Sequence, residues 1–396
     1  MKILVANLGS TSFKYRLFAM EGTEERALAK GGFERVSDFG EVIEAALREL
    51  EEAGHLSGRD DLDAVGFKTV LGKDLSGCVE ADERVLEALR GLESIAPAHN
   101  PAYAAGIEQF RRLTNARLVA LFETSFYQWV PEPARRYAVP ESWYAAGIRR
   151  YGFHGASHKF IAGRSADFLG RNDVAARVRG LYRDGPGEEP EGRPLRVVSC
   201  HLGGSSSVTG IRNGVAVGTS MGLSPQSGLP QNNRVGDLDA MALPLAMEQL
   251  DMGMAEALRQ LTRESGLLGL SGHSNDLRDI GDRAAAGNER CRLALDFLIA
   301  SIRHWIGAFA FQMGGLEAIV FTAGIGENRG DVREGVCAGL EAFGIRLDAE
   351  RNHAAGDGER EVSAPDSGVK VLVLPTNEEL VVARETRRFL EAVPAT

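Results

Sequence analysis

Near its N-terminus the chain reads Leu4-Val5-Ala6-Asn7-Leu8-Gly9-Ser10-Thr11-Ser12, and much later it reads Val198-Ser199-Cys200-His201-Leu202-Gly203-Gly204-Ser205-Ser206-Ser207. Each stretch is an apolar run typical of a buried strand, followed by a polar residue and a turn of glycine and hydroxyl residues. Such a turn exposes backbone N–H groups and hydroxyls without side-chain bulk, so a phosphate group can lie against it. Either copy alone is more often an ordinary hairpin turn. Two copies in one chain predict two related halves that bind one phosphorylated ligand from both sides.

The composition is that of a globular chain with room for two domains. The 396 residues are 44% hydrophobic and 25% charged, which is typical of soluble proteins that bury a full core. The formal net charge of −10 argues against nucleic acid as a partner, because phosphate backbones require a basic surface. An anionic substrate must therefore be held by local cations and backbone dipoles.

The sequence also indicates the cellular compartment of the protein. No apolar stretch looks long enough to span a bilayer, and the apolar N-terminal run ends at Asn7, too early for a secretory signal. The cysteines Cys78, Cys200, Cys291 and Cys337 lie far apart without paired spacing, so they predict neither a disulfide framework nor a thiolate zinc site. We expect a cytoplasmic protein with no membrane partner.

Strand and helix patterns alternate in both halves, which predicts an α/β fold of mixed sheets flanked by helices. We expect strands at 13–18, 64–71, 117–122, 318–322 and 369–374, and helices at 39–53, 82–92, from about 157, at 292–313 and at the C-terminus. The helix at 292–313 is apolar on nearly every side, which predicts that it is buried. Three prolines in 131–140 are typical of a crossing between domains.

Candidates for binding the phosphates of a nucleotide lie on the two turns and on a third segment. Ser10, Ser12 and Lys14 are on the first turn and its exit strand, although Lys14 also suits a solvent-exposed surface. The second turn offers Gly203, Gly204 and Ser205–Ser207. The run 324–328 follows a strand and opens a helix, whose start favours anions, but a plain strand–helix turn fits this run equally well.

Two histidines and one arginine are candidates for the chemistry itself. His154 and His158 have a spacing that fits a metal site, but no third ligand completes it. His154 is better explained as a hydrogen-bond partner of a phosphoryl oxygen, and His158 as a buried residue that fixes a turn. Arg234 suits the charge on a phosphoryl group in transfer, unless Asp237 or Asp239 holds it in a surface pair.

Two acids, Glu123 and Glu378, follow strands in opposite halves. A carboxylate at a strand end can hold magnesium directly or through water, so the pair suits a metal–nucleotide site between two domains. Each of them alone is more often a helix cap or a surface acid.

Together these stretches resemble the acetate kinases, short-chain carboxylate kinases of the actin/sugar-kinase/heat-shock ATPase superfamily. The resemblance covers nearly the whole chain and rests on residues 7–14, 96–101, 151–158, 201–203, 219–222, 234–237, 274–279, 321–328 and 375–380. It implies a two-lobed, duplicated ribonuclease-H-like (actin-like ATPase) fold. The N-terminal actin-like lobe would span 1–127, with the C-terminal helix 380–396 packing back on it, and 128–379 would form the nucleotide-binding lobe. The resemblance further implies a homodimer.

The resemblance also assigns roles, residue by residue. Asn7 and Glu378 would hold Mg²⁺, with Mn²⁺ as an alternative, and Ser10, Ser12 and Lys14 would neighbour the phosphates of ATP. The nucleotide site would comprise His201, Leu202, Gly203, Gly204, Ser205, Asp276, Leu277, Arg278, Gly324, Ile325, Gly326, Glu327 and Asn328. The catalytic residues would be His154, Arg234, Glu123 and Lys68, and the acid pocket would comprise Lys68, Val70, Ala98 and Pro225.

The chain departs from the family pattern in the acid half of the site. Lys68 stands where the family typically has an arginine thought to hold the substrate carboxylate, and a lysine lacks the two-pronged geometry. Glu123 stands where the family has aspartate, Tyr127 replaces a histidine, and 229–233 replaces a Met- and Gly-containing stretch. Ala98 replaces a larger apolar residue, which leaves room for a longer acid.

The activity implied is reversible, ATP-dependent phosphorylation of a short-chain carboxylic acid, acetate or propionate, to an acyl phosphate by in-line transfer. No general base is needed, because a carboxyl group with a pKa of about 4–5 is already ionised at neutral pH. Two alternatives stay open: a kinase for a different or larger carboxylic acid, and a nucleotide-binding protein of the same fold that has lost turnover.

Overall fold

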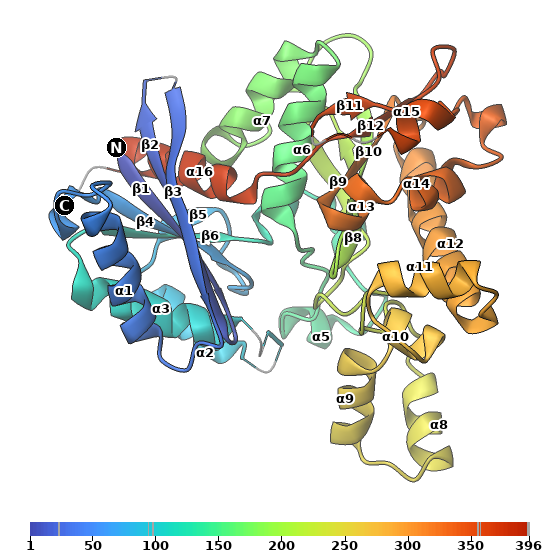
Figure 1. The fold of residues 1–396 in the computed structure, drawn as a ribbon, viewed down its shortest axis with the longest axis horizontal. Coiled ribbons are helices and arrows are strands. Elements are labelled where there is room, and N and C mark those ends of the chain that lie inside the picture. The colour runs from blue at the N-terminus through green and yellow to red at the C-terminus, as the bar shows by residue number, and fades with distance from the viewer. Residues whose placement is uncertain (23, 94, 97–98, 355, 357, 394–396) are drawn as a thin grey trace.

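The structure is a computed structural model that describes residues 1–22, 24–93, 95–96, 99–354, 356 and 358–393, and it contains two six-stranded sheets (Figure 1). The first sheet has the order β3 (Glu24–Glu34), β2 (Ser12–Glu21), β1 (Lys2–Gly9), β4 (Ala64–Thr69), β6 (Arg117–Phe122), β5 (Cys78–Glu80). The second has the order β11 (Arg360–Glu361), β12 (Lys370–Val373), β10 (Ala318–Thr322), β7 (Arg196–Leu202), β8 (Ser206–Arg212), β9 (Val215–Thr219).

The two sheets have the same topology. In the first, β1, β2 and β3 form an antiparallel meander, β4 and β6 run parallel to β1, and β5 is an antiparallel edge strand. In the second, β7, β8 and β9 repeat the meander, β10 and β12 repeat the parallel strands, and β11 repeats the edge. The duplicated ribonuclease-H-like fold predicted from the sequence is therefore confirmed.

Helices cover both faces of the first sheet, so its central strand is buried on both sides. Leu4, Ala6 and Leu8 of β1 pack in one core cluster with α1 (Phe39–Glu52), α2 (Glu83–Gly91) and α3 (Asn100–Leu113). Ile3 and Val5, which alternate with them, pack on the other face against α16 (Glu378–Ala392). This alternation is the period of two expected for a strand, here with an apolar environment on both faces.

Helix α16 follows the last strand of the second sheet yet packs against the first. A Cβ at Gly66 of β4 would lie 2.5 Å from Thr386 Oγ1, so only glycine allows α16 to lie this close to the sheet. The helix is also fixed to α6 (Gly155–Phe168) by a buried ion pair, in which Lys159 Nζ lies 2.8 Å from Glu385 Oε1. The boundary between lobes at 127/128 stays a prediction.

The second sheet lies between α6 and α7 (Asn172–Asp184) on one face and α12 (Glu289–Gln312) on the other. The hairpin of α8 (Ala242–Gln249) and α9 (Met254–Arg263) projects from this half (Figure 1). The remaining helices are α4 (Glu132–Arg135), α5 (Glu141–Ala145), α10 (Gly266–Ser271), α11 (Leu277–Ala285), α13 (Ala323–Asn328), α14 (Gly330–Cys337) and α15 (Ala349–His353), with 3₁₀ turns at Arg59–Asp61, Ser125–Tyr127 and Glu341–Phe343.

Two expectations about α12 are wrong. Its Leu298, Ile302 and Ile306 pack in the second core, but Phe297 is 47% exposed and Phe311 80%, so the helix is buried on one side only. By length and composition alone it could also cross a membrane, contrary to the expectation from the sequence. One such helix is weak evidence, because a core helix of a soluble protein passes the same test.

Candidate active site

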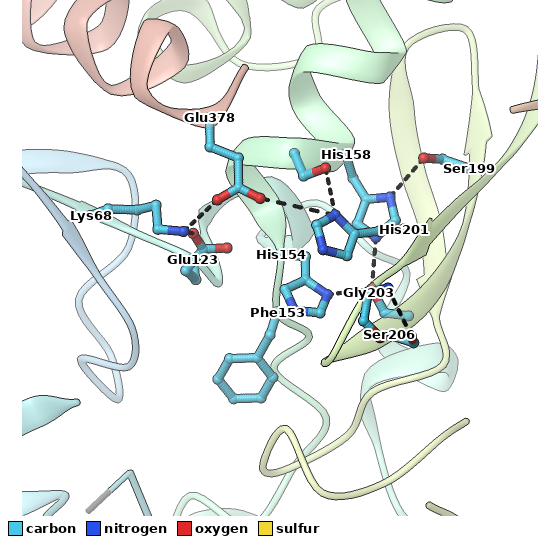
Figure 2. Close-up of polar contacts among 12 residues, drawn as sticks. Lys68, Glu123, Phe153, His154, His158, Ser199, His201, Gly203, Ser206 and Glu378 are labelled. Carbon is cyan, nitrogen blue, oxygen red and sulfur yellow. Dashed lines mark hydrogen bonds and ion pairs between the residues drawn. The ribbon is translucent and has the colours of Figure 1, made fainter. Parts of the chain in front are cut away.

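An ammonium group and two carboxyl groups meet where strands of the two halves end. Lys68 lies near the end of β4, Glu123 directly follows β6, and Glu378 begins α16. Lys68 Nζ donates a hydrogen bond to Glu378 Oε2, and it lies 3.5 Å from Glu123 Oε1 (Figure 2). All three side chains are at most one-fifth exposed, so these charges interact with little screening by water.

The ionisation of this triad reflects its burial and mutual attraction. Burial alone would lower the pKa of Lys68, but the Glu378 and Glu123 carboxylates outweigh it and raise that pKa well above its ordinary value. Burial raises the pKa of Glu378, but Lys68 and then His201 outweigh it, so the net pKa is lowered. Burial raises the pKa of Glu123 to about 7, an effect that Lys68 opposes and Glu378 reinforces. Within the described residues, neither Glu123 carboxyl oxygen accepts a hydrogen bond.

His154 stands beside this triad, stacked on His201. The two ring centroids are 4.1 Å apart, and His201 Nδ1 lies 3.9 Å from Glu378 Oε1 and 2.8 Å from Ser157 Oγ (Figure 2). Burial and then the His201 and His158 rings lower the pKa of His154 well below its ordinary value, so its imidazole is neutral at pH 7. A neutral imidazole offers one N–H donor and one acceptor.

The backbone holds His154 in place. It is the N-cap of α6 and has φ of 59°, a left-handed conformation that is uncommon for a residue with a side chain. The next residue, Gly155, donates its N–H to the Glu123 carbonyl at 3.0 Å, and a Cβ there would lie 2.1 Å from that oxygen. The start of α6 is thus pressed against the end of β6, which keeps His154 next to Glu123.

His158 is a buried structural residue, as its position in the sequence suggested. Its Nδ1 lies 2.8 Å from Ser199 Oγ and its Nε2 lies 2.8 Å from Ser207 Oγ, so both ring nitrogens have partners. Ser207 Oγ also lies 2.8 Å from His154 Nδ1. Because one hydroxyl donates only one hydrogen bond, one of the two histidines must donate to Ser207. No group of three or more His, Cys, Asp or Glu suited to a metal occurs in the part of the chain that the structure describes.

Arg234 is not held by a neighbouring acid. Its Nη1 lies 3.2 Å from Gln231 Oε1 and 3.5 Å from both Ser205 Oγ and the Pro225 carbonyl. Across the described ranges it forms no ion pair, and Asp237 instead accepts from the Gly228 N–H. The surface-pair alternative for Arg234 is therefore wrong, and its guanidinium retains charge for an anionic ligand.

His99 connects Arg234 with the triad. Burial, followed by the charges of Arg234 and Lys68, lowers the pKa of His99 to about 4. Both cations therefore lie within electrostatic reach of this imidazole, which is neutral at pH 7.

The second phosphate turn adjoins the other predicted nucleotide segment. A Cβ at Gly203 would lie 3.7 Å from Ala323 Cβ at the start of α13, and Gly204 accepts a hydrogen bond from the Asn232 N–H at 3.3 Å. The structure thus brings together the turn 203–207, the helix carrying 324–328 and the loop carrying Arg234. Asp276 caps α11 by accepting from the Arg278 N–H, and the Leu277 side chain is buried in the second core.

A cavity of about 430 Å³ lies beside α11. Arg278 lines it together with Gly281, Arg292, Arg329 and Asp331, among others. It is large enough for a nucleoside-sized ligand and carries both cations and carboxylates for polar recognition.

The first turn makes few contacts with the rest of the site. Lys14 pairs with Glu34 of β3 at 3.2 Å, and both side chains are more than three-fifths exposed. Over the described ranges, no hydrogen bond or ion pair joins Ser10, Ser12 or Lys14 to the second turn. Asn7 is connected differently, because its Oδ1 accepts a hydrogen bond from the Tyr103 hydroxyl at 3.1 Å.

The predicted acid pocket is described only in part. Val70 follows β4 and is buried, and the Pro225 carbonyl is near Arg234, as described above. Ala98 lies outside the described residues. Phe153, which precedes His154, is buried as well and lies beside it (Figure 2).

Sequence reasoning missed Tyr103, Gln231 and two of the serines that contact the histidines, Ser157 and Ser199. Gln231 lies in the stretch 229–233, which departs from the family pattern. That departure is the sequence signal that could have identified Gln231 as a site residue. Tyr103 carries no signal in the sequence, because its link to Asn7 exists only once α3 has packed on β1.

Comparisons with known proteins fit this arrangement of two ribonuclease-H-like halves, the architecture of the actin/sugar-kinase/heat-shock ATPase superfamily. The model of the Acetokinase family matches residues 33–179 and 188–384. The chain belongs to this family. It is 40% identical to the acetate kinase of Heliobacterium modesticaldum, over 99% of this chain and 100% of that protein, and 37% identical to the acetate kinase of Bacillus cytotoxicus, over 98% of each.

Solved structures agree over the same length. The acetate kinase of Porphyromonas gingivalis superposes with a TM-score of 0.86 at 33% identity, covering 98% of this chain and 99% of that one. A propionate kinase from Francisella tularensis superposes with a TM-score of 0.82 at 29% identity, covering 97% and 98%.

The ionisation of Glu123 predicts how stability depends on pH. Between about pH 4.5 and about pH 7 the folded protein keeps a proton on Glu123 that the unfolded chain has lost, so the free energy of unfolding falls as pH rises through this window. Glu123→Gln removes this contribution. We expect urea unfolding to show a smaller loss of stability between about pH 5 and about pH 8 in Glu123→Gln than in the wild type. Glu52→Gln, at an exposed position, should keep the wild-type difference, and equal pH dependence in Glu123→Gln would contradict the prediction.

Proposed function

We propose that this protein transfers the γ-phosphoryl group of ATP reversibly to a short-chain carboxylic acid, acetate or propionate, to form an acyl phosphate. Membership of the family supports the reaction class. The observation that carries the proposal is the gathering of Arg234, neutral His154 and the Lys68 triad around one site. Arg234 supplies positive charge and His154 a hydrogen-bond donor for a phosphoryl group in transfer, and the carboxyl groups of the triad supply oxygen ligands for a cation.

In this proposal the chain positions the reactants and neutralises charge, and it needs no general base. The ionised carboxylate of the acid attacks phosphorus in line, and ADP leaves. The guanidinium of Arg234 and an imidazole N–H of His154 would contact the equatorial phosphoryl oxygens. Closure of the lobes would exclude water, which would otherwise accept the phosphoryl group.

The residues present also fit a divalent cation. Among the described residues no donor bonds the two buried carboxyl oxygens of Glu123, Glu378 pairs with the same Lys68 ammonium group, and Asn7 offers an amide oxygen from β1. Mg²⁺ prefers such oxygen ligands and is usually held by one or two carboxylates together with substrate phosphates. We propose that Asn7 and Glu378 hold Mg²⁺, with Mn²⁺ as an alternative, and that the ion neutralises phosphate charge when it is bound.

For the nucleotide, we propose that the turn at 201–205 binds the phosphates. The segments 276–278 and 324–328 would bind the nucleoside in or beside the cavity that Arg278 lines. Ser10, Ser12 and Lys14 would neighbour the phosphates only after the lobes close, since Lys14 is exposed in the structure.

The identity of the acid depends on Lys68. One of its three N–H donors is bonded to Glu378, and its charge is also paired with the nearby Glu123, so less of its binding capacity is available for the carboxylate of a substrate. This favours weak capture of acetate and supports a second candidate function, a kinase for a different or larger carboxylic acid bound by additional contacts with Val70 and Pro225.

We also propose a cytoplasmic homodimer. The exposed side of α12 borders an apolar groove of about 600 Å³, and Ile306, Ala310, Phe311, Leu340 and Phe343 are among its lining residues. Contiguous apolar surface of this kind favours association, and a second copy of the chain is the occupant that the family resemblance implies.

A direct assay tests the function. Purified protein, ATP and Mg²⁺ are incubated with acetate, propionate, butyrate and longer acids, and acyl phosphate is trapped as the hydroxamate. Product from acetate or propionate is the expected result, whereas product only from other acids supports the second candidate. Nucleotide binding without product from any acid would contradict both and favour a non-catalytic role.

Lys68→Arg should lower the KM for acetate by about threefold or more, because a guanidinium can pair with Glu378 and still offer two parallel N–H donors to a carboxylate. Steady-state kinetics at saturating ATP measures this, and Lys68→Met, which lacks donors, provides the opposite control. An unchanged or higher KM in Lys68→Arg would reject this account of weak carboxylate capture.

Phe311→Arg should convert the dimer to monomers, because it introduces a charge into the apolar groove. Sedimentation velocity measures the mass of each species. Trp143→Arg, at an exposed aromatic residue of α5, is the matched control and should leave the dimer intact. A monomeric wild type would contradict the proposal.

A further inference from the structure

A second polar cavity, of about 200 Å³, lies between the turn that follows β4, the residues that follow β6 and residues 135–151, which precede α6. Its charged lining residues are four cations and one acid: Lys73, Arg135, Arg149, Arg150 and Asp74. None of the residues assigned to the catalytic or nucleotide site lines it. In a chain with a formal net charge of −10, this is a local excess of positive charge.

These cations are poorly neutralised by the protein. Arg149 Nη2 lies 3.3 Å from Asp74 Oδ1, but the Asp74 side chain is 75% exposed, so water weakens this pair. In the part of the chain that the structure describes, Lys73, Arg135 and Arg150 form no ion pair. Like charges held together at a cavity repel one another unless an anion lies between them.

Arg135 gives the most specific evidence. Its Nη1 donates to the Gln128 carbonyl at 3.4 Å, but its Nε is buried and has no hydrogen-bond partner among the described residues. A buried guanidinium N–H without an acceptor is costly, so an acceptor from outside the chain is expected. Arg150 lies over the Tyr137 ring, 4.9 Å from its centroid, which fixes the guanidinium without neutralising it.

Lys73 indicates that the positive charge is needed here. Its φ is 57°, a left-handed conformation that glycine adopts without strain and lysine does not. The side chain is exposed at the wall of the cavity, so no buried packing compensates for this strain. A lysine at such a position is explained by what its ammonium group binds.

We propose that this cavity is a binding site for a phosphate group, either inorganic phosphate or the phosphate of a small monoester. Planar guanidinium groups bind phosphate oxygens in pairs, and three of them together with one ammonium group match a dianion. At about 30 Å³ for each water molecule, the cavity has room for a phosphate ion and several waters. The inference does not depend on the identity of the acid substrate.

The position of the site relates it to the catalytic residues along the chain. Thr124, which lines the cavity, directly follows Glu123, and Tyr151, which also lines it, precedes His154 by three residues. A bound phosphate would therefore contact the two segments that carry Glu123 and His154, but not these two side chains themselves.

Isothermal titration of the whole protein with inorganic phosphate tests the proposal, and a parallel titration with methyl phosphate distinguishes the free ion from a monoester. The catalytic site can also bind phosphate, so we expect two classes of site in the wild type. In the double variant Arg135→Gln/Arg150→Gln, one class should weaken by about tenfold or more while the other is unchanged. Arg112→Gln, at an exposed arginine of α3, is the matched control and should keep both classes.

A second variant covers the case in which the double variant does not fold. Lys73→Gly replaces an exposed side chain and suits the left-handed backbone, so this variant should fold normally and still bind phosphate more weakly at the same class of site. Identical phosphate binding in the wild type, Lys73→Gly and, where it folds, the double variant would overturn the proposal. The titration measures phosphate binding and not catalysis. A negative result would therefore overturn this proposal without affecting the proposed kinase function.

Discussion

The interaction between the Lys68 ammonium group and the carboxyl groups of Glu123 and Glu378 is the constraint on which the site depends. Lys68 and Glu123 come from the first sheet, whereas Glu378 begins the helix that follows the second. Without the ammonium group, two buried carboxyl groups would face each other and one would have to bind a proton. The ion pair therefore joins the two halves of the molecule at the point where a divalent cation and a phosphoryl group would be held.

The duplicated topology explains why these groups meet. In each half the parallel strands end at one edge of the sheet, and ligands of open α/β sheets bind beyond such carboxyl ends. Lys68 and Glu123 lie at this edge of the first sheet, and His201 and the start of α13 lie at the same edge of the second. His154 is added from the start of α6, and the contact between Gly155 and Glu123 holds it in a left-handed conformation.

Much of this could be predicted from the sequence, since the strands at 117–122 and 318–322, the twin turns and the buried role of His158 follow from local patterns. The failures have physical reasons. An apolar pattern on all sides of α12 does not say which side packs on the sheet, and Phe311 remains exposed. The hydrogen-bond partner of Lys68, Glu378, is 310 residues away, so only the folded chain reveals that one of its donors is occupied. The roles of Ser10, Ser12 and Lys14 stay predictions.

Because α16 covers the face of the first sheet formed by Ile3 and Val5, the first lobe lacks part of its core until α16 has been made. During synthesis the apolar face of β1, which ends at Gly9, stays uncovered until α16, which begins at Glu378, has been made. The strand that is made first is therefore among the last parts of this lobe to be buried on both faces. Deletion of α16 would therefore uncover Ile3 and Val5 of the first strand.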